Sequence, residues 1–164
     1  MIKSNPKAEV LIDKQLIKKL IVDQCPQFAK HEIDYLDSGW DNENFRLGVD
    51  CLIRLPRRRK AVELIENEAY WLEVLRTSLP IAIPQLLFLG KESKIFKWPW
   101  VIYNWIEGTT ANRESLKNSE ADKLVGFLKV LHNMPCDDAP YNAARSESLK
   151  TKTEGVYELS LIHI

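Results

Sequence analysis

Hydrophobic positions follow two different periods along this chain, and each period predicts one kind of element. After Asp13, apolar residues recur every three or four positions until Pro26, which predicts a first helix with Asp13 as its N-cap. Further along, apolar and polar residues alternate, which is typical of half-buried strands. The alternation predicts three strands joined by short turns, over residues 32–36, 44–47 and 51–55. Short connections make these strands an antiparallel meander.

The helical period returns after this meander. It predicts a long helix over residues 59–79. Two apolar runs, over residues 85–89 and 100–104, are separated by polar turn residues and predict a fourth and a fifth strand. The first part of the chain is therefore predicted to be an α+β domain in which one long helix accompanies a five-stranded antiparallel sheet.

A break in the pattern from Glu107 to Thr110 marks the predicted domain boundary. Residues 1–106 then form one domain, and residues 107–164 begin a second, helical one. Within the second domain, Ser119 can cap a helix that stops near Pro135. The tail beyond this helix has little pattern, and its apolar end suits either a native terminus or a reading frame that was cut short.

Composition and charge narrow the class of protein. The 164 residues include 23 basic and 23 acidic side chains, so the formal net charge is zero, which argues against general binding to nucleic acid or to an anionic membrane. The three cysteines, Cys25, Cys51 and Cys136, lie far apart and suit a reduced chain. Neither a signal peptide nor a stretch of membrane-spanning length is present, so we expect a cytoplasmic location.

Glu68 is the most informative single residue. On a helical wheel it falls within the apolar stripe that Leu64, Ile65 and Leu72 form with their neighbours. A carboxylate on a core-facing stripe is costly unless it is paired, and Arg54 on the preceding strand is the predicted partner. Two hypotheses follow: a structural salt bridge, or a cation that the carboxylate holds in place for contact with phosphate oxygens, as kinases arrange it.

Two further segments have site-like composition. The turn from Ser38 to Asn44 joins two strands with one glycine and several small polar residues, which suits either an ordinary hairpin or a loop over phosphates. It is no Walker loop, because no Gly-Lys-Ser/Thr follows it. The aromatic segment from Trp98 to Gly108 suits either core packing or an apolar slot for adenine, whose edge backbone groups would then bind.

Taken in order, these segments resemble the aminoglycoside phosphotransferase family. The resemblance rests on Gly39-Trp40-Asp41-Asn42, on Leu52-Ile53-Arg54-Leu55-Pro56-Arg57-Arg58, on Glu68, on Pro99 to Gly108 and on Leu128 to His132. It covers about residues 30 to 135. It implies a protein-kinase-like fold, in which the first domain is the small lobe and the second is an incomplete helical large lobe.

The resemblance also implies the role of each site residue. The loop from Ser38 to Asn44 would cover the nucleotide phosphates, Arg54 would contact them, and Glu68 would orient Arg54. The segment from Tyr103 to Ile106 would be the hinge between the lobes, with backbone groups of Asn104 and Ile106 on the adenine. The implied nucleotide-binding residues are Ser38, Gly39, Asp41, Asn42, Arg54, Glu68, Tyr103, Asn104 and Ile106.

The catalytic residues that the family requires are missing from the sequence. Its catalytic loop has His-x-Asp and a downstream Asn, and a later Asp binds magnesium, but none of His31, His132 and His163 is followed two positions later by aspartate. Catalytic and metal residues are therefore expected outside this chain. We also expect no metal site within it, because His31 and His163 have no carboxylate or cysteine at ligand spacing in the sequence.

The sequence thus predicts the nucleotide-binding part of a phosphotransferase. Its parent would move the γ-phosphate of ATP or GTP, with magnesium, to a hydroxyl of a small-molecule acceptor that the missing lobe binds. The chain alone would not turn over, because positioning and metal electrostatics supply most of the catalysis in phosphoryl transfer. A non-catalytic module that binds a nucleotide or a protein, and a non-functional gene fragment, remain as alternative hypotheses.

Overall fold

The computed structural model describes residues 5–109, 118–135 and 137–140. The chain divides into two units, residues 1–134 and 135–164, and all helices and strands given below belong to the first. Cys136 and His163 lie outside the described residues. No helix in the described ranges is both long and apolar enough to cross a lipid bilayer.

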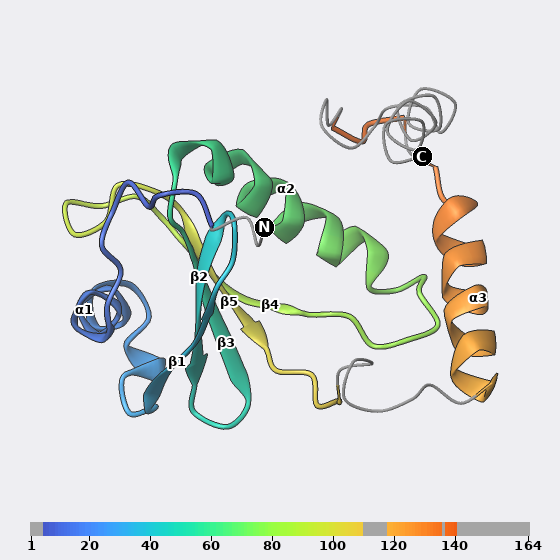
Figure 1. The fold of residues 1–164 in the computed structure, drawn as a ribbon, viewed down its shortest axis with the longest axis horizontal. Helices are drawn as coiled ribbons and strands as arrows, with labels where there is room; N and C mark the ends of the chain where they lie inside the picture. The colour runs from blue at the N-terminus through green and yellow to red at the C-terminus, as the bar shows by residue number, and fades with distance from the viewer. Residues whose placement is uncertain (1–4, 110–117, 136, 141–164) are drawn as a thin grey trace, which may run out of the picture. The chain divides into compact units, whose positions relative to one another are not determined.

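A five-stranded antiparallel sheet forms the centre of the first unit, as the alternating pattern predicts (Figure 1). The strand order is β1-β2-β3-β5-β4, and every neighbouring pair is antiparallel. The meander of the first three strands and the mixed α+β class are confirmed. The strands are β1 (Ile33–Ser38), β2 (Asn42–Leu47), β3 (Cys51–Pro56), β4 (Leu86–Gly90) and β5 (Trp100–Asn104).

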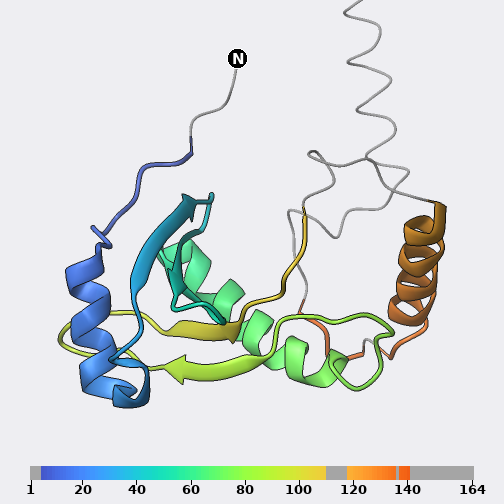
Figure 2. The ribbon, with the colours of Figure 1, turned by 90° about the horizontal axis from the view of Figure 1, so that it is seen from below.

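Helix α1 (Lys14–Gln24) begins where the capping signal predicts. The Leu16 N–H donates to Asp13 Oδ1 at 2.8 Å, which satisfies one of the unpaired donors at the start of the helix. Its apolar side, which includes the buried residues Ile17 and Leu20, packs against the sheet. A short 3₁₀ turn (Pro26–Phe28) follows and leads the chain into β1 (Figure 2).

The long helix is shorter in the structure than the apolar pattern of residues 59–79 predicts. A 3₁₀ turn (Arg59–Ala61) precedes helix α2 (Val62–Leu75), which ends four residues before the predicted Leu79. The Ser78 and Leu79 N–H groups both donate to the Leu75 carbonyl, so the last turn tightens ahead of Pro80, which disfavours helical geometry at the preceding residue. Leu64, expected on the buried stripe, is 41% exposed, because the buried face turns through Ile65 and Ala69 instead.

The two faces of the sheet carry different cores. On one face, apolar residues of β2, β3 and β5, among them Phe45, Ile53 and Trp100, form the larger cluster with α1. On the other face, Val101 and Tyr103 pack with residues of α2. Because side chains alternate along a strand, a single sequence such as β5 contributes to both clusters. This division leaves the α2 face partly open, and that is where the candidate site lies.

Helix α3 (Asn118–His132) matches the predicted helical segment. Three of its apolar side chains, Leu124, Val125 and Leu128, are exposed. The sequence pattern of an apolar stripe is therefore present, but the described residues do not cover it.

Gly90 tests the packing of the sheet end. A Cβ at this position would collide with the indole ring of Trp100, which is fully buried. We expect Gly90→Ala to lower the free energy of unfolding by about 1–3 kcal/mol, because the ring or the backbone must shift in a close-packed core. The measurement is urea-induced unfolding followed by tryptophan fluorescence.

Gly126→Ala is the matched control, because a Cβ at Gly126 in α3 meets no other atom within 4 Å. It is expected not to lower stability, since alanine favours helix by about 0.5–1 kcal/mol over glycine. Equal stability of Gly90→Ala and the unchanged protein would contradict the close contact of Gly90 and Trp100.

Candidate functional site

A cavity of about 690 Å³ opens on the α2 face of the sheet, beside the segment that follows β5. Its wall combines apolar groups on β1 and β3, a guanidinium, and an aromatic ring. The lining residues are Leu36, Asp37, Asn44, Leu52, Arg54, Trp105, Gly108 and Thr109. An apolar wall with a few polar groups is the usual composition of a small-molecule site.

Arg54 is held on the cavity wall by neighbours on two elements. It lies directly opposite Asn44 in the β2–β3 register, and its Nε donates to Asn44 Oδ1 at 3.1 Å. With the Asn42 amide oriented to satisfy its surroundings, Arg54 Nη2 donates to the Asn42 oxygen at 3.0 Å. Arg54 Nη1 donates to Glu68 Oε1 on α2. The guanidinium is therefore fixed in position by three separate acceptors.

The predicted pairing of Arg54 with Glu68 is confirmed. The side chains are 25% and 31% exposed, so the pair is partly screened by solvent and sits at the edge of the apolar α2 cluster. A guanidinium has five N–H donors, and the three contacts with Asn44, Asn42 and Glu68 occupy one each. Two donors remain, and Arg54 lines the cavity, so they are available to an anionic ligand there.

Tyr103 lies behind this pair and not on the cavity wall. It is 1% exposed, pairs with Leu52 across β3 and β5, and packs with Ile65 and Ala69 of α2. Burial, and to a lesser degree the Glu68 carboxylate, raises the pKa of the Tyr103 phenol above its ordinary range. Tyr103 is thus a neutral packing residue between the sheet and α2.

The backbone N–H groups of Asn104 and Ile106, the two positions predicted to bind adenine, differ in whether they are already hydrogen-bonded. The Asn104 N–H donates to the Gln85 carbonyl at 3.1 Å, so it cannot also bind a base. The neighbouring Trp105 N–H donates to the Asp50 carbonyl at 2.6 Å. No described residue accepts from the Ile106 N–H. Of the two predicted positions, Ile106 therefore keeps its backbone donor.

Trp105 is a cavity residue that the sequence analysis did not single out. The Arg46 guanidinium lies 3.6 Å from the centre of the Trp105 ring, and Arg46 Nη2 lies 3.3 Å from Glu107 Oε1. Arg46 also donates from Nε to the Gly48 carbonyl at 3.2 Å. A cation stacked on an indole holds the ring in one orientation. Arg46 thereby ties the segment after β5 to the β2–β3 turn.

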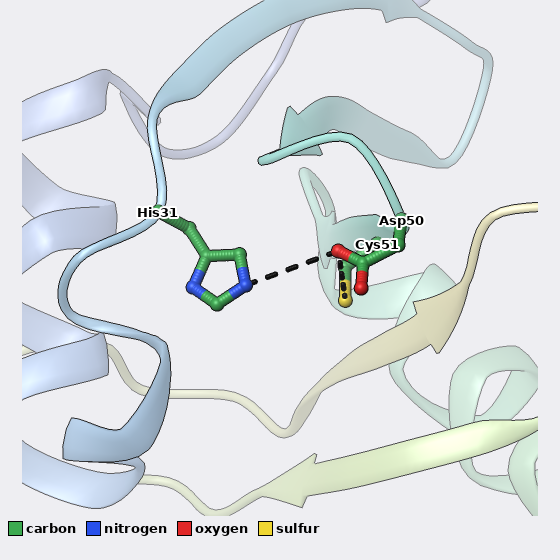
Figure 3. A group of neighbouring side chains, drawn as sticks. All are labelled: His31, Asp50 and Cys51. Atoms are coloured by element: carbon green, nitrogen blue, oxygen red, sulfur yellow. Dashed lines mark hydrogen bonds and ion pairs between the residues drawn. The ribbon is translucent and has the colours of Figure 1, made fainter.

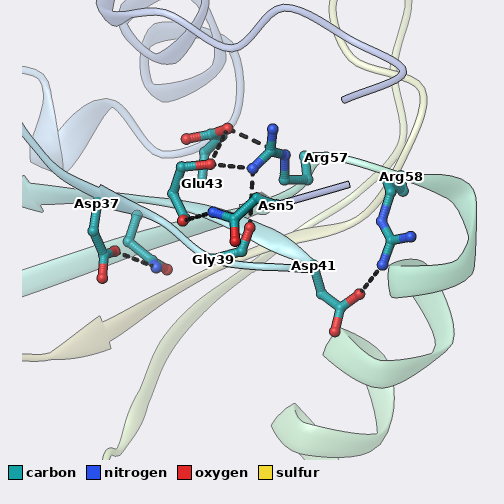
Figure 4. Close-up of polar contacts among 9 residues, drawn as sticks. Asn5, Asp37, Gly39, Asp41, Glu43, Arg57 and Arg58 are labelled. Atoms are coloured by element: carbon teal, nitrogen blue, oxygen red, sulfur yellow. Dashed lines mark hydrogen bonds and ion pairs between the residues drawn. The ribbon is translucent and has the colours of Figure 1, made fainter. Parts of the chain in front are cut away.

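The β1–β2 loop is a tight hairpin whose polar groups are largely used within the protein (Figure 4). Its Gly39 N–H donates to the Asn42 carbonyl at 2.9 Å, and the Gly39 carbonyl accepts from Arg57 Nη1 at 2.9 Å. Ser38 Oγ donates to Glu43 Oε1 at 2.9 Å and accepts from Arg57. Ser38 and Gly39 are therefore fixed by Arg57, and neither lines the cavity.

Arg58 makes the matching contact on the other side of the loop, with Nη2 2.6 Å from Asp41 Oδ1 (Figure 4). Asp41 does not line the cavity, and Asn42 is 7% exposed with its amide toward Arg54. Of the nine predicted nucleotide-binding residues, Arg54 alone lines the described cavity. Glu68 and Asn42 contact Arg54, and Asn104 and Ile106 flank Trp105.

Two of the other cavity residues carried a sequence signal. Leu52 is two positions before Arg54 on β3, so strand alternation places it on the same face. Leu36 follows from the alternation of β1 in the same way. Asn44 requires the strand register, because it faces Arg54 only through the β2–β3 pairing. Trp105 depends on the contact with Arg46, which no local pattern encodes.

The cavity lacks a ligand set for magnesium among the described residues. Asp37 is its one carboxylate there, and Asp37 Oδ1 accepts from Asn44 Nδ2 at 2.6 Å. Magnesium needs oxygen ligands in octahedral geometry and keeps several waters. The apolar and cationic groups of this wall suit a ligand that has both an apolar part and an anionic part.

A second group of side chains comes together at the β2–β3 turn. His31, Asp50 and Cys51 place one possible ligand atom each within 4.8 Å of the others (Figure 3). The sequence analysis expected no metal site because no ligand spacing surrounds His31 along the chain. The fold brings these residues together instead through the 3₁₀ turn after α1 and the end of the β2–β3 turn.

Solved structures share this fold. The chain has 21% identity and a TM-score of 0.74 with the GDP complex of wild-type aminoglycoside 2'-phosphotransferase-IIIa, covering 90% of this chain and 51% of that one. With the GDP and kanamycin complex of APH(2'')-IIIa it has 22% identity and a TM-score of 0.68, covering 76% of this chain and 43% of that one. With the streptomycin–ATP–APH(2'')-IIa ternary complex it has 20% identity and a TM-score of 0.58, covering 93% of this chain and 50% of that one.

The chain spans about half the length of these structures. At this identity they establish the fold, which is the one that the sequence resemblance implied. No curated protein sequence matches the chain significantly. The model of the phosphotransferase enzyme family matches residues 32–154. This range includes all five strands and the helices α2 and α3. This protein therefore belongs to the phosphotransferase enzyme family.

Proposed function

We propose that this chain provides the nucleotide-binding lobe of an enzyme that transfers the γ-phosphate of ATP or GTP to a hydroxyl of a small molecule. The observation that carries the proposal is the placement of Arg54. Its guanidinium is fixed by three acceptors, lines the cavity, and keeps two N–H donors unused. A preorganised cation of this kind suits phosphate oxygens, because it loses little conformational freedom on binding.

The other end of the cavity suits a nucleobase. Leu36 and Leu52 give an apolar wall, Trp105 gives an aromatic ring, and the Ile106 N–H is an open backbone donor. Base at the Trp105 end and phosphates at the Arg54 end would place the nucleotide along β3. In this arrangement Glu68 is a positioning residue, since its carboxylate acts through Arg54.

The tight β1–β2 loop would cover the phosphates from the side of Asn42 and Asn44. Arg57 and Arg58 fix this loop through Ser38, Gly39 and Asp41, which makes these three residues supports of the loop shape. Their assigned role in nucleotide binding is thus indirect. We also propose the boundary after residue 106, at the hinge, as the division between this lobe and the helical one.

The acceptor belongs to the part of the enzyme that this chain does not contain. Solved relatives hold kanamycin or streptomycin, so an aminoglycoside is one candidate, and other small molecules with a hydroxyl are equally compatible with the described residues. The relatives include complexes with GDP and with ATP, so both nucleotides belong in the test. A non-catalytic nucleotide-binding module is the alternative function.

The first prediction for the candidate site concerns the Arg54–Glu68 pair. Arg54→Ala and Glu68→Ala should each weaken binding of ATP or GTP by roughly tenfold, about 1.4 kcal/mol, because charge-assisted contacts to phosphate are lost or misplaced. The double variant should bind no more weakly than the weaker single variant, since both act through one guanidinium. Isothermal titration calorimetry with each magnesium nucleotide gives the affinities.

Arg76→Ala is the control for removal of a positive charge. Arg76 lies just after α2, is about half exposed and pairs only with Glu73 among the described residues. It should leave nucleotide affinity unchanged. Affinities of Arg54→Ala and Glu68→Ala that equal that of Arg76→Ala would remove the basis of the proposal.

The second prediction concerns the Ile106 N–H. Ile106→Pro removes this donor and should weaken nucleotide binding by roughly tenfold, because a base edge would lose its backbone partner in a partly desolvated site. Ile106→Ala keeps the donor and should bind nearly as the unchanged protein does. Equal affinities of the two variants would place the base elsewhere in the cavity.

The third prediction separates binding from chemistry. The 164-residue chain should bind nucleotide but release no phosphate and phosphorylate no acceptor, because its sequence contains no His-x-Asp loop. A coupled assay of nucleoside diphosphate release over hours, with kanamycin as the acceptor, measures this. Turnover above the uncatalysed rate that Arg54→Ala abolishes would show that described residues suffice for catalysis.

A further inference from the structure

His31, Asp50 and Cys51 form a compact group of three different ligand types at the β2–β3 turn (Figure 3). His31 Nε2 lies 3.8 Å from Asp50 Oδ1, and Cys51 Sγ lies 3.6 Å from the same oxygen. Imidazole, carboxylate and thiol are the three side-chain groups that bind zinc in proteins. The group is therefore worth testing as a metal site on geometry alone.

The distances fit a tetrahedral ion with little movement. With zinc bonds of about 2.0–2.3 Å, neighbouring ligand atoms of a tetrahedron lie about 3.3–3.7 Å apart. The two observed separations from Asp50 Oδ1 are 3.8 and 3.6 Å. All three atoms lie within 4.8 Å of one another, so a small rotation of the His31 or Asp50 side chain completes the triangle. The Asp50 side chain is 72% exposed and has room for this movement, while His31 keeps its contacts with Phe28 and Gly48.

The surroundings of His31 orient the correct nitrogen toward the group. His31 Nδ1 lies 3.2 Å from the Phe28 carbonyl, which can only accept, so Nδ1 carries the proton of this hydrogen bond. In the neutral ring the lone pair is then on Nε2, the nitrogen that faces Asp50. A backbone carbonyl on the second nitrogen is the usual support of a histidine that binds a metal.

Gly48 holds the imidazole ring from the other side. Its φ is +62°, and a Cβ there would meet His31 Cδ2 at 2.5 Å, so both the backbone and the ring require glycine. The Gly48 N–H donates to the Glu32 carbonyl at 2.8 Å, which brings the β2–β3 turn against the chain after His31. The ligand position is thus a product of the turn geometry.

The approach to the group is open and carries charges of both signs. A cavity of about 530 Å³ borders His31 and Asp50, and its charged wall residues are Lys30, Glu32, Asp34 and Asp50. The Asp34 carboxylate is paired with Lys14 at 2.9 Å, which leaves Glu32 to balance Lys30 beside the proposed ligand Asp50. The exposed side of the group leaves space for a water molecule as fourth ligand. Cys51 is buried, and burial raises the pKa of its thiol to about 11, so a metal must displace a firmly held proton.

We propose that His31, Asp50 and Cys51 bind one zinc ion that ties the connection between α1 and β1 to the β2–β3 turn. The site is separate from the Arg54 cavity, since Cys51 packs into the α1 face of the sheet while Arg54 faces the α2 side. Its occupant is a borderline-soft divalent ion, because nitrogen, oxygen and sulfur donors together exclude magnesium and calcium.

The ion also connects to the hinge through one residue. The Asp50 carbonyl accepts the Trp105 N–H at 2.6 Å, so an ion held by the Asp50 side chain restrains the backbone that carries the cavity tryptophan. The role assigned to the ion is structural. The three ligand atoms come together only in the folded chain, so zinc binds the folded state more tightly than the unfolded state. Excess zinc should therefore raise the melting temperature.

The test is a zinc titration of the chelator-treated 164-residue chain with zinc chloride and a competing chromophoric chelator. We expect one ion per chain and a rise of several degrees in the melting temperature. Cobalt chloride should give a thiolate-to-cobalt charge-transfer band. His31→Ala and Cys51→Ala should lose stoichiometric binding, and Cys51→Ala should lose the band.

Three further variants make the result decisive. Asp50→Asn alters an exposed side chain and should fold normally, but its zinc affinity should fall by at least about tenfold. His132→Ala on α3 and Cys25→Ala in the core remove the same residue types and should keep one ion per chain. Circular dichroism and urea unfolding without metal check that each variant folds.

Absence of stoichiometric zinc would overturn the proposal and leave only a contact between His31 and Asp50 at this turn. Stoichiometric binding that His31→Ala and Asp50→Asn do not weaken would overturn it as well, since the ion would then lie elsewhere. Nucleotide affinity of the unchanged protein, measured in the same chelator-treated sample, reports on the Arg54 cavity separately.

Discussion

The guanidinium of Arg54 is the interaction on which the candidate site depends. Its three acceptors come from β2 and α2, so the strand register, the position of the helix and the shape of the cavity are joined at one group. A cation held at 25% exposure on an otherwise apolar wall is stable because Glu68 and two amide oxygens replace water. Its remaining donors are available to an anionic ligand in the cavity.

The alternation of β3 makes this arrangement possible. Ile53 and Leu55 point into the core with α1, while Leu52 and Arg54 point to the cavity. A shift of one residue in the β2–β3 register would exchange these two sets, placing a guanidinium in the apolar core. The same register puts Cys51 on the α1 face beside Asp50 and His31. The two candidate sites thus lie on opposite faces of one strand end.

Two contacts around the β2–β3 turn connect the sites to the segment after β5. Arg46 stacks on Trp105, and the Asp50 carbonyl accepts the Trp105 N–H. The tryptophan ring is consequently set by residues that neither line the cavity nor belong to the same element. Under the proposed function, these fixed charges and backbone donors would provide the positioning part of phosphoryl transfer.

The sequence by itself determined the five strands, the α1 cap and the pairing of Arg54 with Glu68, because local periodicity and the cost of an unpaired buried carboxylate act within short stretches of chain. It did not determine the end of α2, the cavity role of Trp105, or the use of Ser38 and Asp41 as anchors for Arg57 and Arg58. Only the tertiary structure decided these, since each depends on a side chain from a different element. The meeting of His31 with Asp50 and Cys51 has the same origin: strand register and a glycine turn bring together residues that no sequence spacing relates.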